Sequence, residues 1–375
     1  MSEPASLSEF LSSCDAVERL IRLPETVCID DILIRGGDRF SDIFLVQALI
    51  GLLNRSPPLT LKWTGHQAAT FFSLASKHAI LGCMLLHDKV RHEYADGTIF
   101  PTVKARLAIN QSKLVFDWFS EPKALLCGDH FGLGRQRELY LSSASTGIQP
   151  LEHFEELIYP YVETQLAVGV EDKTAFKWRA ALTSIVFELF ENTDLHGRTD
   201  WNGKVLQNSI RGLLFRDAEV SGYHALQKKS PAPIRCLEIG VFDSGVGYYG
   251  KYCKKQLTDI VPIQEEWDVL HQCLSTHLED GAVPNVGEGQ RGIGLYEVLR
   301  ALKFLNGAIE FRTGHIHAYR SFLPGDLLVQ MEPSDSKLRP NMPKPALLDY
   351  SKKYFSKPTK ETAVSGTAVR VLIPV

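Results

Sequence analysis

The sequence lacks a hydrophobic run long enough to cross a membrane. The chain has 375 residues, yet none of its uninterrupted apolar stretches approaches the ~18 residues that a spanning helix needs. The first twenty residues carry acidic side chains and no basic segment ahead of an apolar stretch, which is not the pattern of a secretory signal. We therefore expect a cytoplasmic protein that does not associate with membranes.

Cysteine is sparse and shows no pairing pattern. The seven cysteines are spread widely along the chain, and none form a CxxC pair. An odd and scattered set argues against a disulfide framework and against a zinc site. We expect these residues to be small core side chains or ordinary thiols in a reducing compartment.

An excess of basic residues is also missing. The 41 Lys and Arg residues stand against 44 Asp and Glu residues, for a formal net charge of -3. No basic stripe with interleaved aromatic residues is present either, so the sequence gives no support for nucleic-acid binding. The composition is that of a globular protein, and the length predicts two or three domains.

Strand-like and helical stretches alternate between residues 25 and 95. TVCIDDILI and PLTLKW are strand-like, whereas FSDIFLVQALIGLLN and HQAATFFSLASKHAIL have the apolar spacing of helices, the first with Ser41 as a candidate N-cap. This alternation predicts a small α/β domain over residues 1–150, whose element order loosely resembles the STAS fold.

Two features of this N-terminal part are weak functional signals. His87 and His92 are five residues apart, which suits neither a helical nor a strand ligand pair, so we expect both at the surface. The stretch GDHFGLGRQ (128–136) has glycines in a spacing compatible with phosphate binding, but an ordinary loop is the stronger expectation.

The second predicted domain, residues 151–375, begins with two helical stretches, PLEHFEELIYPYVETQLA and KTAFKWRAALTSIVFELFENTDLH. Gly197 fits the position that ends the second helix. Two strand-like runs follow, SIRGLLFRD and IRCLEIGVFDSG, so this half also has an α/β pattern.

The second helix becomes polar in its last turns. Glu188, Asn192 and His196 stand at i, i+4 and i+8 and therefore share one stripe. An Asn side-chain oxygen suits Mg²⁺, and a carboxylate one turn earlier can hold an attacking water as general base. Glu191 and Asp194 point elsewhere, and we expect them to be solvated. The alternative is a helix that simply emerges into solvent.

The stretch LEIGVFDSGVGYYG is an apolar strand that ends in Asp243, Gly245 and Gly247. The carboxylate can accept a hydrogen bond from an exocyclic amine such as that of adenine, and the glycines leave room for a flat ring. An ordinary β-turn is the alternative.

The stretch GEGQRGIGLYEVLRALKF places Gly292 and Gly294 before a helix that starts near Leu295. Backbone N–H groups at a helix N-terminus bind phosphate, and Arg291 is either a γ-phosphate clamp or a solvent-facing residue. The spacing is not that of a P-loop. In the C-terminal SGTAVRVLIPV, the hydroxyl of Thr367 can support the contact between an Asp and adenine.

The order ExxxNxxxHG, DxGxG, GxGL and GT before a final strand resembles the GHKL ATPase superfamily. This superfamily includes gyrase B-type ATPases, heat-shock chaperones, mismatch-repair ATPases, sensor histidine kinases and anti-sigma serine kinases. The resemblance covers roughly residues 170–375. It implies a two-layer α/β sandwich of the Bergerat type, with helices on one face of a mixed sheet. A lid would lie at about 248–291, and 314–362 would be an insertion.

The resemblance implies a site for ATP and Mg²⁺. Asn192 and Glu188 would lie at the metal, with Glu188 as the general base, and Asp243 would contact the adenine amine. The other nucleotide-binding residues that it implies are His196, Gly245, Gly247, Arg291, Gly292, Gly294, Leu295 and Thr367.

Three functions stay open. The first is an ATPase whose nucleotide state drives a conformational or dimerisation switch in a regulatory or defence context. The second is a protein kinase, either a serine kinase of a partner protein or, less in keeping with the sequence, a histidine kinase with His153 as phospho-acceptor. The third is a non-hydrolysing ATP-binding module. A protein partner or a homodimer is expected.

Overall fold

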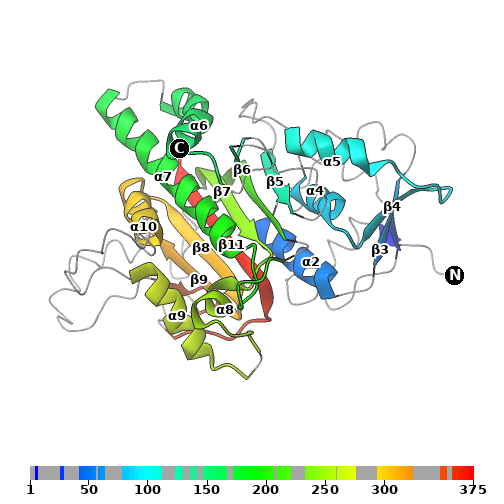
Figure 1. Cartoon of the computed structure of the whole chain (residues 1–375). Helices are drawn as coiled ribbons and strands as arrows, with labels where there is room; N and C mark the ends of the chain where they lie inside the picture. Colours follow the sequence, from blue (N-terminus) through cyan, green and yellow to red (C-terminus); the bar gives the residue numbers. More distant parts are fainter. Residues whose placement is uncertain are drawn as a thin grey trace.

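The computed structural model of the chain (Figure 1) describes residues 5–6, 26–28, 42–55, 58–63, 78–111, 123–129, 136, 138–141, 147–166, 172–206, 209–220, 233–258, 260–275, 294–323, 347–352 and 357–375.

Seven strands form one sheet, in the order β10-β9-β8-β11-β7-β6-β5, and every neighbouring pair runs antiparallel. The strands are β5 (Lys123–Gly128), β6 (Ile210–Val220), β7 (Ile234–Asp243), β8 (Ala308–Gly314), β9 (Ile316–Ser321), β10 (Leu348–Asp349) and β11 (Val364–Pro374). The predicted mixed sheet is therefore wrong. His315 alone separates β8 from β9, a connection far too short for the crossover that parallel strands need.

Helices cover both faces of this sheet. Those of residues 151–375 share the core on one face, as predicted, whereas the helices on the other face come from the N-terminal part. One core is shared by α6 (Leu151–Leu166), α7 (Asp172–His196), α9 (Ile263–Ser275) and α10 (Gly294–Phe304). On the other face, α2 (Ile43–Arg55) and α4 (Ala79–Leu86) pack against Leu126, Leu214 and Phe242. Figure 1 shows α7 lying across the sheet on one side and α2 and α4 on the other.

The residues of β7 explain this three-layer arrangement. Ile239 and Val241 belong to the core beneath α7, whereas Phe242 belongs to the core beneath α2, as the alternation along a strand requires. At Gly240, an added Cβ atom would lie 2.6 Å from Cδ1 of Ile43, so α2 approaches the strand closely. The N-terminal part of the chain therefore completes the core around the C-terminal sheet.

Four parallel strands form a second, smaller sheet in the order β1-β2-β3-β4. They are β1 (Ala5–Ser6), β2 (Thr26–Cys28), β3 (Leu59–Trp63) and β4 (Val90–Tyr94), and α5 (Thr102–Gln111) follows them. The predicted strand, helix and strand correspond to β2, α2 and β3. The predicted helix over 66–81 overlaps α4 only at 79–81, and its residues 66–77 lie outside the described part. The large sheet nevertheless extends across the predicted boundary at residue 150, because β5 pairs with β6. At its opposite edge it takes in β9 and β10, which lie within 314–362.

Three local predictions in the N-terminal part were wrong or fall outside the described residues. Asp42 caps α2, since its Oδ1 accepts the backbone N–H of Phe44 at 2.9 Å; Ser41 lies outside the described part. His87 and His92 are 1% and 4% exposed, so they are buried rather than at the surface. His92 lies on β4, where its Nδ1 accepts the indole N–H of Trp63 of β3 at 3.1 Å, and Nε2 of His87 lies 3.1 Å from Asn54 Oδ1 of α2.

In the predicted lid, the structure describes α8 (Gly247–Cys253) and α9, while residues 276–291 lie outside the described part. Glu266 of α9 binds the β8–β9 turn, with Oε1 2.6 Å from Nδ1 of His315 and Oε2 accepting the His315 N–H at 3.0 Å. Among the described helices, none combines the length and the apolar character that crossing a membrane would demand.

Candidate functional site

The polar end of α7 carries Glu188 and Asn192 one turn apart, both partly buried. The side-chain nitrogen of Asn192 donates a hydrogen bond of 2.8 Å to the backbone carbonyl of Glu188. Only the NH₂ group of an amide can donate, so the bond fixes the orientation of the amide. The Asn192 side-chain oxygen is thus directed away from the helix backbone and suits a hard cation.

Glu188 lies in a setting that favours a base. Burial, followed by the nearby Glu191 and Glu297 carboxylates, raises the pKa of Glu188 above its ordinary value. Gly294, the first residue of α10, lies against this side chain: an added Cβ would be 2.2 Å from Glu188 Oε2 and 3.7 Å from Asn192 Nδ2. The N-terminus of α10, with its outward N–H groups, therefore faces both polar residues of α7.

Other predicted residues on α7 and α10 have different surroundings. His196 is exposed, at the end of α7. Leu295 is 5% exposed and belongs to the core beneath the helices. Arg291 and Gly292 lie outside the described residues, so their predicted contact with phosphate stays a prediction.

Asp243 ends β7, between Arg211 of β6 and Thr367 of β11 in the strand register. Its side chain is 6% exposed. Oδ1 accepts the backbone N–H of Gly245 at 2.8 Å, and the carboxylate also accepts the backbone N–H of Thr367. Because a carboxylate has about four acceptor positions, Asp243 can still accept a hydrogen bond from a ligand amine.

The pKa of Asp243 is raised to about 6 by burial, although its two backbone hydrogen bonds and the charges of Arg211 and Lys251 oppose the shift. The carboxylate is therefore ionised at neutral pH in a place where ionisation is costly. A strongly perturbed carboxyl at the end of a strand is the kind of group found at functional sites.

Glycines close around Asp243 from three directions. An added Cβ on Gly197 would lie 2.4 Å from Asp243 Cβ, one on Gly245 would lie 3.0 Å from Oδ1, and one on Gly366 would lie 2.0 Å from the backbone oxygen. Gly366 also has a φ of 70°, a conformation that glycine adopts without strain. The end of α7, the turn after β7 and the start of β11 thus meet at one carboxylate.

A bulge in β11 brings the Ser365-Gly366-Thr367 motif to this point. Thr367 pairs with Thr313 of β8, but the next pair is Val364 with Gly314, so Ser365 and Gly366 have no opposite residue on β8. The Thr367 hydroxyl donates to Thr313 Oγ1 at 3.3 Å, and Thr313 Oγ1 donates to the Gly366 carbonyl at 3.3 Å. Both hydroxyls therefore belong to residues next to Asp243 in the sheet, since Thr367 pairs with Asp243 on one side and with Thr313 on the other.

The turn after Asp243 leads into α8 past Gly247. Gly247 has a φ of 70°, and an added Cβ would be 2.6 Å from Thr313 Oγ1, so a larger residue does not fit there. A small cavity next to Thr313, with room for about one water molecule, is lined by Tyr248, Tyr249 and Glu266. The start of α8, the end of β8 and α9 of the predicted lid thus border this cavity.

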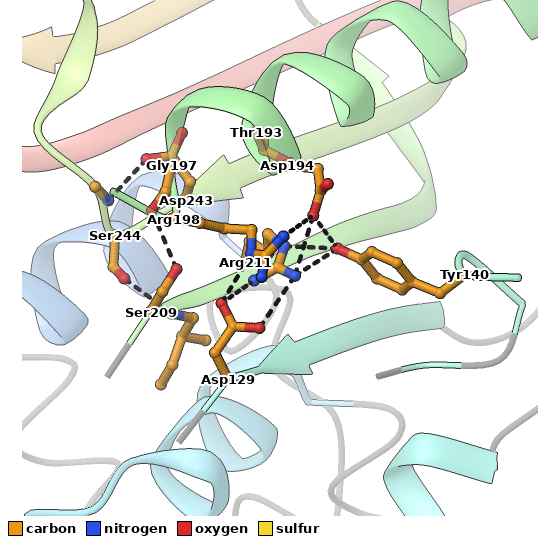
Figure 2. Close-up of polar contacts among 12 residues, drawn as sticks. Asp129, Tyr140, Thr193, Asp194, Gly197, Arg198, Ser209, Arg211, Asp243 and Ser244 are labelled. Carbon is orange, nitrogen blue, oxygen red and sulfur yellow. Dashed lines mark hydrogen bonds and ion pairs between the residues drawn. The ribbon is translucent and has the colours of Figure 1, made fainter. Parts of the chain in front are cut away.

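A buried ionic network behind Asp243 was not predicted from the sequence (Figure 2). Arg211 is 0% exposed; its Nη1 lies 2.9 Å from Asp129 Oδ2 and its Nη2 lies 3.2 Å from Asp194 Oδ1. The Tyr140 hydroxyl donates to Asp194 at 2.6 Å, and Arg198 Nε donates to Asp129 at 3.2 Å. The expectation that Asp194 is solvated is wrong, because this network buries it to 8% exposure.

The network joins the end of α7 to β5 and β6. Ser209, just before β6, donates its hydroxyl to the Gly197 carbonyl at 3.0 Å, and the Ile210 N–H donates to Ser244 Oγ at 2.9 Å. The sequence signal for the network was weak. It consisted of one Arg inside the apolar run SIRGLLF and of acidic residues far away along the chain. No sequence pattern indicates which of these acidic residues pairs with the Arg.

The residues at the end of α7 fit the Mg²⁺ that the resemblance implies. Within the described ranges, no three His, Cys, Asp or Glu side chains gather as a metal site made of protein alone. Mg²⁺ needs no such group, since it takes one or two protein oxygens and completes its shell with phosphates and water. The Asn192 amide oxygen and the Glu188 carboxylate, one turn apart, match that requirement.

The chain was compared with protein-family models, with curated proteins and with solved structures. No family model matches, and neither a curated protein nor a solved structure does.

Proposed function

We propose that the chain binds Mg-ATP in a Bergerat-type site, in the manner of the GHKL superfamily. The observation that carries the proposal is the convergence of four separate sequence motifs on one helix and one strand end. Gly294 of α10 lies against Glu188 and Asn192, while glycines from α7, the β7 turn and β11 surround Asp243. None of the motifs is specific alone, but together they supply the base, phosphate and metal contacts of one nucleotide.

The two points of convergence are spaced for a nucleoside triphosphate. Glu188 and Gly197, which lies against Asp243, are separated by roughly 13 Å along α7, at about 1.5 Å per residue. With adenine at Asp243, the phosphates extend along α7 to the N-terminus of α10. Backbone N–H groups there bind negative oxygens favourably.

Glu188 supports hydrolysis rather than binding alone. A bound Mg²⁺, held by Asn192, would offset charge on the phosphate oxygens. The Glu188 carboxylate would hold a water molecule and accept its proton, a task that its raised pKa favours. ATP hydrolysis that drives a conformational or dimerisation switch is therefore the function that we favour.

Phosphotransfer to a protein is the second candidate, because the same pocket serves it. His153 is a poor acceptor: it is only partly exposed and lies on α6, which packs against α7. A histidine kinase would have to pull this helix away from the core that α6 and α7 share. A serine kinase of a partner protein and a non-hydrolysing module have no such obstacle.

The fate of a γ-labelled phosphate distinguishes these functions. The full chain is incubated with labelled ATP and Mg²⁺, with Glu188→Gln and, as a matched control on the same helix, Glu191→Gln. Free phosphate supports an ATPase, label on a protein supports a kinase, and retained ATP supports a sensor. We expect Glu188→Gln to lose at least about a hundredfold in product formation while Glu191→Gln keeps it. Equal turnover in both variants would contradict the role of Glu188.

A further inference from the structure

Helix α2, from the N-terminal part of the chain, makes a polar contact with the loop that carries the Ser365-Gly366-Thr367 motif. Gln47 is 1% exposed. Its Nε2 donates to the backbone carbonyl of Arg312 at 3.0 Å and to that of Ser365 at 3.2 Å. These carbonyls belong to β8 and β11, so a single side chain of α2 joins the two strands where the β11 bulge begins.

The bulge needs this contact because it lacks ladder partners. Ser365 and Gly366 stand opposite no residue of β8, and a bulge leaves such residues unpaired. Unpaired buried carbonyls are unfavourable. The Gly366 carbonyl accepts the Thr313 hydroxyl at 3.3 Å, and the Ser365 carbonyl accepts Gln47. Gly51, one turn along α2, also lies close to Ser365: an added Cβ would be in ordinary van der Waals contact with Ser365 Oγ at 3.5 Å.

The bulge in turn determines what Asp243 contacts. It places Gly366 so close that an added Cβ would be 2.0 Å from the Asp243 carbonyl oxygen. It also places the Thr367 N–H on the Asp243 carboxylate. A contact that holds the Ser365 carbonyl therefore acts, through three consecutive residues, on the carboxylate assigned to adenine.

We propose that Gln47 is a positioning residue for the nucleotide pocket, which holds the Ser365-Gly366 bulge so that the Thr367 N–H reaches Asp243. This inference rests on the proposed function and extends it. Under this inference, α2 of the N-terminal part supports the residues that contact adenine. Any partner or ligand that moves α2 would change the affinity of the pocket for adenine.

The positioning role predicts a change in pH dependence that a general loss of stability does not. Besides its two backbone donors, Asp243 is faced by the charges of Arg211 on β6 and Lys251 on α8. Loss of Gln47 leaves both charges in place but weakens the Thr367 hydrogen bond that favours the ionised carboxylate. Asp243 would then take up its proton at a higher pH, so that on acidification the loss of ATP binding would begin at a higher pH than in the wild type.

The test compares Gln47→Met with Gln136→Met in the full chain. Gln136 is an equally buried control, 0% exposed, whose Nε2 donates to the Ile109 carbonyl at 3.4 Å. We expect Gln47→Met to bind Mg-ATP about tenfold more weakly than the wild type and to distinguish ATP from GTP less well. The midpoint of the pH dependence of its ATP affinity should lie at a higher pH than in the wild type. The control should match the wild type in all three. Equal behaviour of the two variants would overturn the proposal.

Hydrogen exchange in the nucleotide-free chain tests the same contact independently of ATP. We expect the amides of residues 365–367 to exchange at least about tenfold faster in Gln47→Met than in the wild type, and unchanged exchange would overturn the proposal. If the wild type does not bind Mg-ATP at all, the proposed function fails, while exchange still decides whether Gln47 holds the bulge. If Gln47→Met does not fold, Gln47→Asn, one methylene shorter, replaces it in both measurements.

Discussion

Asp243 is the residue on which the proposed adenine contact depends. The ionised carboxylate accepts hydrogen bonds at both of its oxygens, whereas the protonated form carries an O–H donor on one of them. Burial raises the pKa of Asp243 to about 6. The affinity for Mg-ATP should therefore be constant from pH 7 to pH 8 and fall as the pH drops through about 6. Binding isotherms between pH 5 and 8 measure this fall. An affinity that does not change over that range would contradict the assignment of Asp243.

The same carboxyl is expected to lower the stability of the nucleotide-free fold. Since its pKa is about 6 in the folded chain and 3.8 ordinarily, the folded state binds the proton more tightly. Its contribution is most favourable below pH 3.8 and is lost as the pH rises through about 6. The ionised form costs the fold on the order of 3 kcal/mol.

Asp243→Asn should consequently unfold at equal or higher denaturant concentration than the wild type at pH 8, although it binds ATP poorly. An uncharged amide avoids the burial of a charge while keeping an acceptor oxygen for the Gly245 N–H. Chemical denaturation without nucleotide measures the difference. A clear loss of stability would show that Asp243 serves the fold rather than a ligand.

At the scale of elements, the polar end of α7 is held by Arg211, which is paired with Asp129 and Asp194. Arg211→Met would leave two carboxylates buried without this partner, a change that typically costs about 3–5 kcal/mol. The matched control is Arg235→Met, since Arg235 also pairs with an Asp, Asp217, but is 47% exposed. It should cost less than about 1 kcal/mol.

Denaturant unfolding of both variants compares the two ion pairs directly. Because the network fixes the helix end that carries Gly197, Arg211→Met should also weaken ATP binding where it still folds. Equal stability of the two variants would contradict the view that the network anchors α7.

The elements of the site differ in how far the sequence predicts them. Helices α7 and α10 and strands β7 and β11 follow from local patterns: apolar spacing, a final glycine, and alternation of side chains. The β11 bulge does not, because it depends on the pairing of Thr367 with Thr313 and of Val364 with Gly314, which no local pattern encodes. The same holds for the burial of Asp194, whose partners Tyr140 and Arg211 come from two other segments of the chain.

At the scale of the whole molecule, the N-terminal part and the sheet share one core. The sequence hint was slight: in the run LEIGVF of β7, one alternate set is apolar throughout, and the other contributes Phe242 beside Glu238 and Gly240. The predicted boundary at residue 150 relied on element order alone. Composition and periodicity do not tell which face of a sheet a distant helix covers, so that contact needed the structure.

A chain that begins at residue 120 would test the shared core. It lacks α2 and α4 and would expose the apolar face that contains Leu126, Leu214 and Phe242. We expect this shortened chain to bind a hydrophobic dye and to unfold without a cooperative transition. Cooperative unfolding equal to that of the full chain would show that the C-terminal sheet folds without the N-terminal layer.

Nucleotide binding at Asp243 is tested by a titration of the full chain with Mg-ATP at pH 8, alongside Asp243→Asn and the control Asp217→Asn. Asp217 lies on the neighbouring strand in an exposed ion pair with Arg235. We expect equal affinity for the wild type and Asp217→Asn, and binding about a hundredfold weaker for Asp243→Asn. Absence of binding by the wild type, or equal affinity of all three chains, would contradict this expectation.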